Sequence, residues 1–148
     1  MEIRSYSERE TIDAGKKFAK SLKEKDVVVL EGDLGGGKTT FTKGVLKGLG
    51  CSQRVLSPSF TLVRQYKAGR FCVYHLDLYR LKRADTLSLG MEDFLYSDKS
   101  ISLIEWGNKI KQELDKYIKI KFSFLGQNSR QLKFSVQGYS EERISSFK

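Results

Sequence analysis

A glycine-rich segment in the first third of the chain has the residue types and spacing of a phosphate-binding loop. It matches the pattern G-x-x-x-x-G-K-[ST] at every position, with Gly32, Asp33, Leu34, Gly35, Gly36, Gly37, Lys38 and Thr39. Glycines let backbone amides turn towards a phosphate, and Lys38 can reach the β- and γ-phosphate oxygens. The Thr39 hydroxyl can ligate Mg²⁺. The loop therefore predicts a site for a nucleoside triphosphate, ATP with Mg²⁺.

Two carboxylates follow strand-like runs and could complete this site. Asp77 comes after the run FCVYHL, and Glu105 comes after ISLI. An acid at the end of a strand beside a phosphate loop can hold Mg²⁺ or orient an attacking water. The alternative for either acid is a cap or a surface salt bridge. With the loop upstream, we expect at least one of the two to belong to the metal site.

The chain lacks the sequence marks of a GTPase. Such proteins carry Asp-x-x-Gly after the second strand, whereas Asp77 is followed by Leu-Tyr-Arg. They read guanine with Asn-Lys-x-Asp, whereas the run that begins at Asn108 ends in Lys111 and so lacks the carboxylate. Adenine is therefore favoured over guanine.

Two alternative functions remain open besides that of an ATPase. Arg80 and Arg83 could clamp a transferring phosphate in a small-molecule or nucleoside kinase. The 148 residues, however, leave little room for both a lid and an acceptor pocket. The non-enzymatic reading is a nucleotide-sensing module whose ATP state gates assembly.

The elements that must position these residues can be read from hydrophobic spacing and turn signals. A capping box from Ser7 to Glu10 precedes an amphipathic helix, and Val27 begins a short run typical of a strand buried on both faces. We expect helices over residues 39–49, 85–95 (interrupted at Gly90) and 108–116, a buried strand over 101–104, and hairpins over 61–75 and 117–136. Ser140 is expected to cap a terminal helical turn. The pattern predicts an α/β fold, a single-domain P-loop NTPase spanning residues 1–148, with three layers and a mixed sheet including antiparallel hairpins.

Composition sets the wider limits. The chain is 39% hydrophobic and 30% charged, with no run apolar enough for a membrane span and no secretory signal at its start. Its two cysteines are too few for a disulfide framework or metal site, so we expect a cytoplasmic protein. The net charge of +9 fits either RNA contact within an assembly or a solvated lysine-rich surface.

Four motifs in this order resemble those of the TsaE (YjeE) family. They are the loop segment 31–41 (EGDLGGGKTTF), segment 57–63 (SPSFTLV), segment 75–81 (HLDLYRL) and segment 104–106 (IEW). Each motif after the phosphate loop is weak alone, and together they are specific. Gly36 stands where the family usually has alanine, and Ser59 where it has threonine. Ser59 keeps the hydroxyl but lacks the methyl group that would fix its rotamer.

The resemblance assigns roles to individual residues. It gives Lys38 to the phosphates, Thr39 and Glu105 to Mg²⁺, and makes Asp77 a catalytic or water-holding acid. Thr11 corresponds to a threonine near the nucleotide, where it could line the base or ribose pocket, or be an ordinary polar residue of a first helical turn. The remaining nucleotide contacts are expected from the loop and the residue after it: Asp33, Leu34, Gly35, Gly36, Gly37 and Thr40.

The same resemblance implies a function. The family comprises ATPases that support formation of N6-threonylcarbamoyladenosine (t6A) at position 37 of tRNAs reading codons that begin with A. These proteins act with the transferase pair TsaD and TsaB, while TsaC-type enzymes make the threonylcarbamoyl-adenylate. It implies an ATPase subunit, weak alone, that drives or resets the transferase complex.

Several motif residues are candidates for a switch or for partner contact: Ser59, Thr61, His75, Tyr79, Arg80 and Trp106. For His75 the alternative is a hydrogen-bonded histidine at a strand end. For Trp106 it is half-buried packing. Tyr79 and Arg80 could face phosphate or partner, or merely close a turn.

Overall fold

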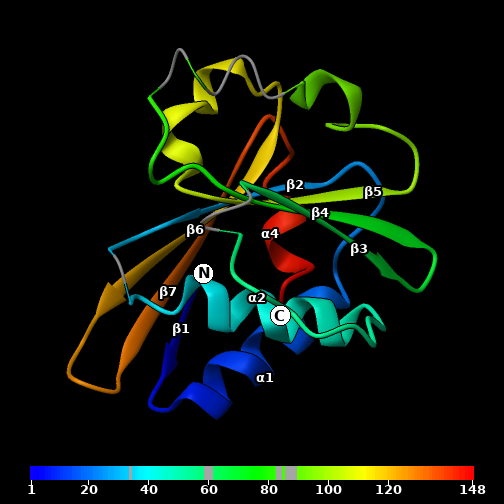
Figure 1. Ribbon diagram of the computed structural model, residues 1–148. Coiled ribbons are helices and arrows are strands. Elements are labelled where there is room, and N and C mark those ends of the chain that lie inside the picture. The colour runs from blue at the N-terminus through cyan, green and yellow to red at the C-terminus, as the bar shows by residue number, and fades with distance from the viewer. Residues whose placement is uncertain (34, 59–61, 83–84, 86–89) are drawn as a thin grey trace.

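The chain folds around one mixed sheet. The computed structural model describes residues 1–33, 35–58, 62–82, 85 and 90–148, and the strands of that part lie in the order β1-β7-β6-β2-β5-β4-β3 (Figure 1). The strands are β1 (Glu2–Ser5), β2 (Val27–Glu31), β3 (Val63–Ala68), β4 (Phe71–Asp77), β5 (Ser100–Glu105), β6 (Tyr117–Phe124) and β7 (Arg130–Gln137). At the centre β6, β2, β5 and β4 run parallel, while β1, β7 and β3 add antiparallel pairs at the edges. The predicted α/β class and both predicted hairpins are confirmed.

The central strands are hydrophobic on both sides because both faces of the sheet are covered. Four consecutive residues of β2, beginning at Val27, are buried, and so is every residue of β5. The parallel register of β4 and β5 sets Asp77 opposite Glu105. Both acids therefore stand at the same edge of the sheet.

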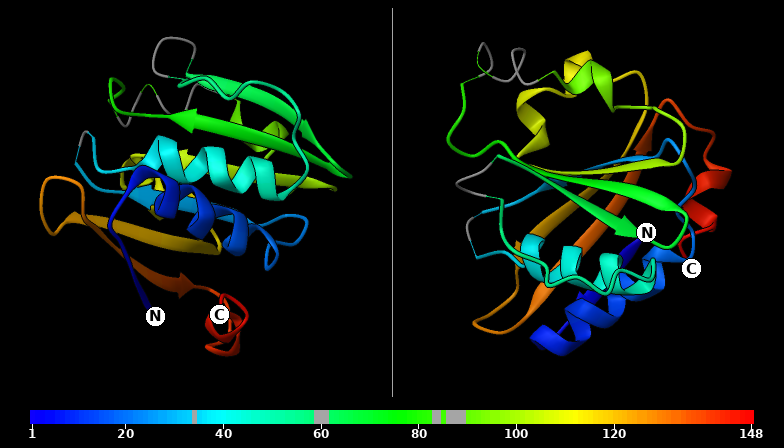
Figure 2. Two further views of the ribbon diagram at one scale, coloured as in Figure 1. Left: turned by 90° about the horizontal axis from the view of Figure 1, so that it is seen from below. Right: turned by 45° about the vertical axis from the view of Figure 1, so that its right-hand side comes forward.

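Helices α1 (Glu8–Ala19) and α2 (Lys38–Gly48) lie side by side on one face, as Figure 2 shows. Their backbones approach so closely that a Cβ on Gly15 would lie 2.3 Å from the Phe41 carbonyl oxygen. A Cβ on Gly44 would lie 2.1 Å from the Ile12 carbonyl oxygen. Only glycine fits at these two positions, which fixes how the two helices cross.

The predicted capping box at the start of α1 is present. The Ser7 hydroxyl accepts from the Glu10 amide at 3.1 Å. The Glu10 carboxylate accepts from the Tyr6 amide at 2.8 Å, one residue earlier than in the usual box. This cap places the first turn of α1 beside the loop after β2.

The opposite face is covered by the segments that follow β4 and β5. Short 3₁₀ turns η1 (Met91–Asp93), η2 (Gly107–Lys109) and η3 (Lys111–Glu113) contribute to this layer. Its core consists of buried apolar side chains: Val27, Val29, Leu76, Leu78, Met91, Ile104, Ile110 and Leu114. The three-layer arrangement is confirmed, and from residue 90 to residue 116 the helical turns of this layer are 3₁₀ turns.

One predicted helix is wrong, and the described part of another agrees with its prediction. In the range 108–116, Ile110 has φ −126°, which separates η2 from η3. In the range 85–95, Asp85 is helical, Gly90 is left-handed at the expected interruption, and the turn η1 follows; residues 86–89 lie outside the description. Apolar residues such as Ile110 are buried in this range, although the backbone around them is not α-helical.

The chain ends pack against the rest of the fold. Strand β1, which the sequence did not predict, pairs with β7. The short helix α4 (Glu142–Ser145) is present as expected, but its cap residue is Glu141, and Ser140 contributes its carbonyl to the Arg143 amide. The ring of Phe147 lies 5.2 Å from that of Phe18 in α1. No helix in the described part of the chain is long and apolar enough to cross a membrane.

Candidate nucleotide site

The loop between β2 and α2 has the backbone of a phosphate cradle. Gly37 is the residue before α2 and has φ 99°, and Gly32 has φ 147°. A side chain at Gly32 would press within 2.7 Å of the Phe122 carbonyl oxygen. The loop is thus wedged between α2 and β6, with the amino end of α2 facing outward as an anion site. Leu34 lies outside the described residues.

Lys38 is the cation of this loop. Its Nζ donates to the Gly32 carbonyl at 2.5 Å and to the Asp33 carbonyl at 2.9 Å. The residue is only 5% exposed. Burial lowers the pKa of Lys38, and the charges of Glu105, Asp77 and Asp33 oppose that shift. The ammonium is therefore a desolvated charge for which an anionic ligand would be a strong partner.

A chain of three side chains crosses the sheet edge next to Lys38. The Thr39 hydroxyl donates to the Glu105 carboxylate, with 3.1 Å to Oε1 and 3.4 Å to Oε2. On its other side Glu105 Oε2 lies 2.6 Å from His75 Nε2. His75 is completely buried, and its Nδ1 has no hydrogen-bond partner among the described residues. His75 thus stands behind Glu105 and helps to fix its orientation.

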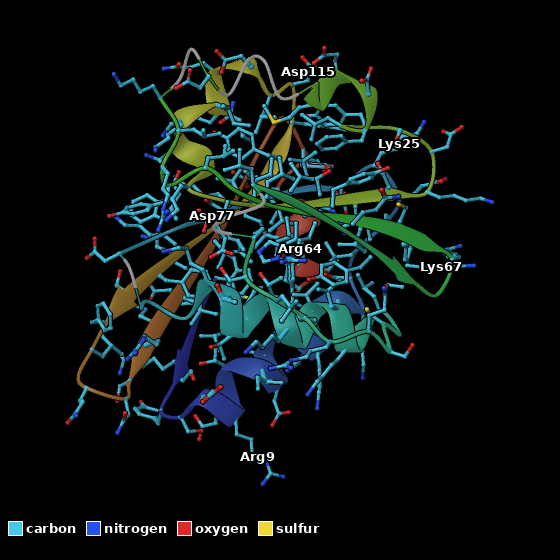
Figure 3. All side chains as sticks on the ribbon, in the orientation of Figure 1. Arg9, Lys25, Arg64, Lys67, Asp77 and Asp115 are labelled. Carbon is cyan, nitrogen blue, oxygen red and sulfur yellow. The ribbon has the colours of Figure 1, made fainter. Side chains whose placement is uncertain are left out.

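Asp77 lies beside this chain, at the end of β4. It is largely buried, and its Oδ1 accepts from the Tyr79 amide at 2.9 Å. Figure 3 labels Asp77, which lies near the edge of the sheet where the first residues of α2 also lie. Both predicted acids therefore reach the phosphate loop, as the strand-end argument required.

A cavity of about 540 Å³ opens over the loop. Many of the predicted site residues line it: Thr11, Gly35, Gly36, Gly37, Lys38, Thr39, Thr40, Asp77, Glu105 and Trp106. Asp33 contributes through its carbonyl to Lys38. Ser59 and Thr61 lie outside the described residues. The cavity brings together most of a set that is spread over almost a hundred positions of the sequence.

Trp106 lines the cavity, and two further motif residues, Tyr79 and Arg80, lie near it without lining it. The Trp106 ring is 4.6 Å from Lys38 Nζ and 5.0 Å from the Tyr79 ring. Tyr79 is 44% exposed, and Arg80 is exposed as well. Trp106 therefore connects the buried ammonium with an aromatic side chain at the surface.

Sequence reasoning missed part of the wall: Tyr6, Ser7, Glu8, Ser57, Asn128 and Arg130. Arg130 begins β7, and its Nη2 donates to the Gly35 carbonyl at 3.2 Å. Its guanidinium also lies 4.3 Å from the Phe124 ring. The far hairpin thus reaches the phosphate loop, and no local signal in the sequence indicates it.

Thr11 borders the loop but its hydroxyl is engaged elsewhere. It lies 2.6 Å from the Ser5 hydroxyl and donates to the Ser7 carbonyl at 3.2 Å. Its methyl group is the part that approaches Gly37. Thr11 therefore offers an apolar contact rather than a free hydroxyl.

The donor set suits Mg²⁺ bound together with phosphate. In the described residues no three His, Cys, Asp or Glu side chains form a cage for a metal ion. Mg²⁺ bound to a nucleotide needs none, because it takes one or two protein oxygens, phosphate oxygens and water. The Thr39 hydroxyl and the Glu105 carboxylate, already in contact, are hard oxygen donors of that kind.

The glycine loop lies at the carboxyl end of a parallel strand, and the helix after it begins with Lys-Thr. This arrangement defines a P-loop NTPase fold. The family model described as "Threonylcarbamoyl adenosine biosynthesis protein TsaE" matches residues 5–132. The chain belongs to the TsaE family.

Individual relatives agree with this assignment. The tRNA threonylcarbamoyladenosine biosynthesis protein TsaE of Bacillus subtilis is 35% identical over 142 residues, covering 95% of this chain and 89% of the relative. The protein of that name from Nostoc sp. is 38% identical, covering 82% and 76%. The one from Rickettsia conorii is 42% identical, covering 84% and 71%. The crystal structure of Bacillus subtilis YdiB superposes with a TM-score of 0.84 at 32% identity, covering 99% of this chain and 93% of that one.

Proposed function

We propose that this chain binds and hydrolyses ATP with Mg²⁺, as the ATPase subunit that t6A formation requires at position 37 of tRNAs reading codons that begin with A. The observation that carries the proposal is the convergence of Lys38, Thr39, Asp77 and Glu105 on one cavity over the phosphate loop. A cation, a hydroxyl and two carboxylates at this place match the parts of a phosphoryl-transfer site.

Each residue has a defined task in this mechanism. Lys38 leaves its two carbonyl acceptors for the β- and γ-phosphates and stabilises the charge that develops there. Thr39 and Glu105 would hold Mg²⁺, which would neutralise part of the charge of the phosphates. Asp77 orients the attacking water from the neighbouring strand end. His75 holds Glu105 in place from behind.

The rest of the nucleotide is proposed to follow the cavity away from the acids, between α1 and the β6–β7 hairpin. Tyr6 and the Thr11 methyl group form one side of this part, and Asn128 and Arg130 form the other. Tyr6 is an exposed aromatic ring, and aromatic rings stack on nucleobases. This placement would leave the γ-phosphate at the end where Asp77 and Glu105 stand.

Membership of the family supports a proposal for the partners. The relatives above bear names of tRNA threonylcarbamoyladenosine biosynthesis. We propose that this chain acts in the cytoplasm with TsaD and TsaB, which carry out the transfer, and meets tRNA through that complex. ATP hydrolysis would then drive or reset the transferase.

The test is threonylcarbamoyl transfer to tRNA in a reconstituted mixture of TsaC, TsaD and TsaB. It is run with this chain, without it, and with Lys38→Ala, and ATP binding is measured on the isolated proteins. We expect multiple turnover only with the unchanged chain, and loss of ATP binding in the variant. Full modification in the absence of the chain would refute the role in t6A formation. Phosphate transfer to a small acceptor in place of water would indicate the kinase instead.

A further inference from the structure

A lysine outside the cavity makes an unusual set of contacts. Lys109 Nζ donates to three backbone carbonyls, those of Leu78 at 2.7 Å, Tyr79 at 2.6 Å and Leu81 at 2.7 Å. An ammonium has three N–H donors and no acceptor, so these bonds use its full capacity. The side chain is committed to one short loop.

That loop follows Asp77 directly and carries Tyr79 and Arg80. It is folded back on itself by a bond from the Leu81 amide to the Leu78 carbonyl, and its first amide, that of Leu78, donates to the Glu105 carbonyl at 3.1 Å. Three carbonyl oxygens that point at one place repel one another unless a positive charge lies between them. The conformation of the loop therefore depends on Lys109.

Lys109 is itself held firmly. It ends η2, just after Glu105 and Trp106, and the neighbouring Ile110 is fully buried. The backbone at Gly107 lies so close to β2 that a Cβ there would be 2.7 Å from the Val29 side chain. A fixed turn after β5 thus presents the ammonium that holds the loop after β4.

We propose that Lys109 is a positioning residue, which locks the loop bearing Tyr79 and Arg80 against the segment bearing Glu105 and Trp106. It does not touch the cavity and acts only through the loop carbonyls. Loss of this contact should slow ATP hydrolysis, because the locked loop follows Asp77 directly and the other segment carries Glu105. This consequence rests on the proposed function. The locking itself does not depend on nucleotide.

The test compares Lys109→Met with Lys111→Met. Lys111 lies on the next turn, and its Nζ is 4.0 Å from the Glu31 carboxylate, so the control removes a lysine without touching the loop. Trypsin is added to the native proteins, and cleavage of the bond between Arg80 and Leu81 is followed by mass spectrometry. Cleavage of a native loop reports its local opening.

We expect cleavage in Lys109→Met to be about tenfold faster than in the unchanged chain, the effect of losing one net hydrogen bond to a charged group. Lys111→Met should match the unchanged chain. Urea unfolding of each protein separates local opening from global unfolding. Should Lys109→Met fail to fold, Lys109→Arg replaces it and is expected to give a smaller increase, because a planar guanidinium keeps the charge but cannot address all three carbonyls.

Trp106 supplies a second readout, since it is the only tryptophan of the chain and its ring contacts Tyr79. Release of the loop should increase acrylamide quenching of its fluorescence in the Lys109 variant and leave the Lys111 variant unchanged. With ATP, kcat should fall about tenfold while KM stays within about twofold, because Lys109 lies outside the cavity. Unchanged cleavage and unchanged quenching would overturn the proposal. If Lys109→Met changes both cleavage and quenching but the unchanged protein hydrolyses no ATP, the proposed function is overturned and the positioning role of Lys109 stands.

Discussion

Strand β2 has a buried charged cluster at each end, and the two clusters differ in what they face. At its start, Asp26 accepts from Arg143 Nη2, from the Lys23 amide at 2.7 Å and from the Tyr139 hydroxyl at 2.8 Å. Arg143 also donates to the Ser21 carbonyl at 2.7 Å. Both carboxylate oxygens of Asp26 are engaged, and this cluster ties the end of the chain to the turn before β2.

At the other end of β2, the charges of Lys38, Asp77 and Glu105 border a cavity. Lys38 donates hydrogen bonds to two carbonyls of its own loop, and no carboxylate among the described residues shares these bonds. Each cluster holds one buried nitrogen without a hydrogen-bond partner among the described residues, Arg143 Nε in the first and His75 Nδ1 in the second. A buried charge without compensation costs stability, so the first cluster serves the fold and the second is arranged for a ligand. The predictions below test that division.

The largest effect is expected from Arg143→Met. It leaves the Asp26 carboxylate buried without its cation, so the free energy of unfolding should fall by about 3–5 kcal/mol. Urea unfolding measures the change. ATP affinity per folded molecule should stay the same, since Arg143 lies at the other end of β2. A loss below about 1 kcal/mol would contradict the structural role of this cluster.

Glu105→Ala tests the opposite end. Removing a proposed metal ligand should lower the rate of Mg²⁺-dependent hydrolysis on the order of a hundredfold, about 3 kcal/mol of transition-state stabilisation, and weaken ATP binding much less. Steady-state hydrolysis at saturating ATP gives kcat, and equilibrium titration gives the affinity. Normal hydrolysis by this variant would show that the proposed metal site is wrong.

Tyr139→Phe should give a smaller, pH-dependent effect. Burial raises the pKa of Tyr139, and the neighbouring Asp26 carboxylate raises it further. Above pH of about 10 the unfolded chain releases this proton while the folded chain keeps it, so stability must fall as the pH rises there. The variant should lose about 1 kcal/mol at neutral pH and show a shallower decline above pH of about 10. Unfolding curves at several pH values compare the two proteins, and parallel declines would refute the assignment.

Asp13→Asn is the control with the smallest expected effect. Asp13 pairs with Lys16 at 3.5 Å, and these side chains are 57% and 48% exposed. Exposed pairs contribute about 0–1 kcal/mol, so stability should change by less than about 0.5 kcal/mol. If Asp13→Asn lowers the free energy of unfolding as much as Arg143→Met does, the larger effect of Arg143→Met cannot be attributed to burial of its ion pair.

Local pattern was enough to predict the phosphate end of the site. Gly32 to Thr39 are contiguous, so the loop and α2 follow from one segment of sequence. The positions of Asp77 and Glu105 also follow, because each ends a hydrophobic run and parallel strands end at one edge of a sheet. These features depend on neighbours in sequence or on a general rule of topology.

The other end of the cavity could not be predicted in this way. Arg130 reaches Gly35 only because β6 and β7 form a hairpin beside β2 that extends to the loop. Tyr6 lies there because β1 pairs with β7, a contact between residues over a hundred positions apart. The predicted helix over 108–116 is replaced by the turns η2 and η3, and Ile110 and Leu114, which lie four residues apart, are buried through packing on the sheet.

The contact between Gly15 and Gly44 has a consequence for motion. With their backbones this close, α1 and α2 cannot slide or separate without breaking the packing around Phe18 and Phe41, whose rings lie 5.7 Å apart. Thr11 stands on the first of these helices, and the phosphate loop opens into the second. Any displacement of α1 must carry α2 along, so the described wall of the pocket can open where the β6–β7 hairpin, the segment around Ser57 or the loops after β4 and β5 move.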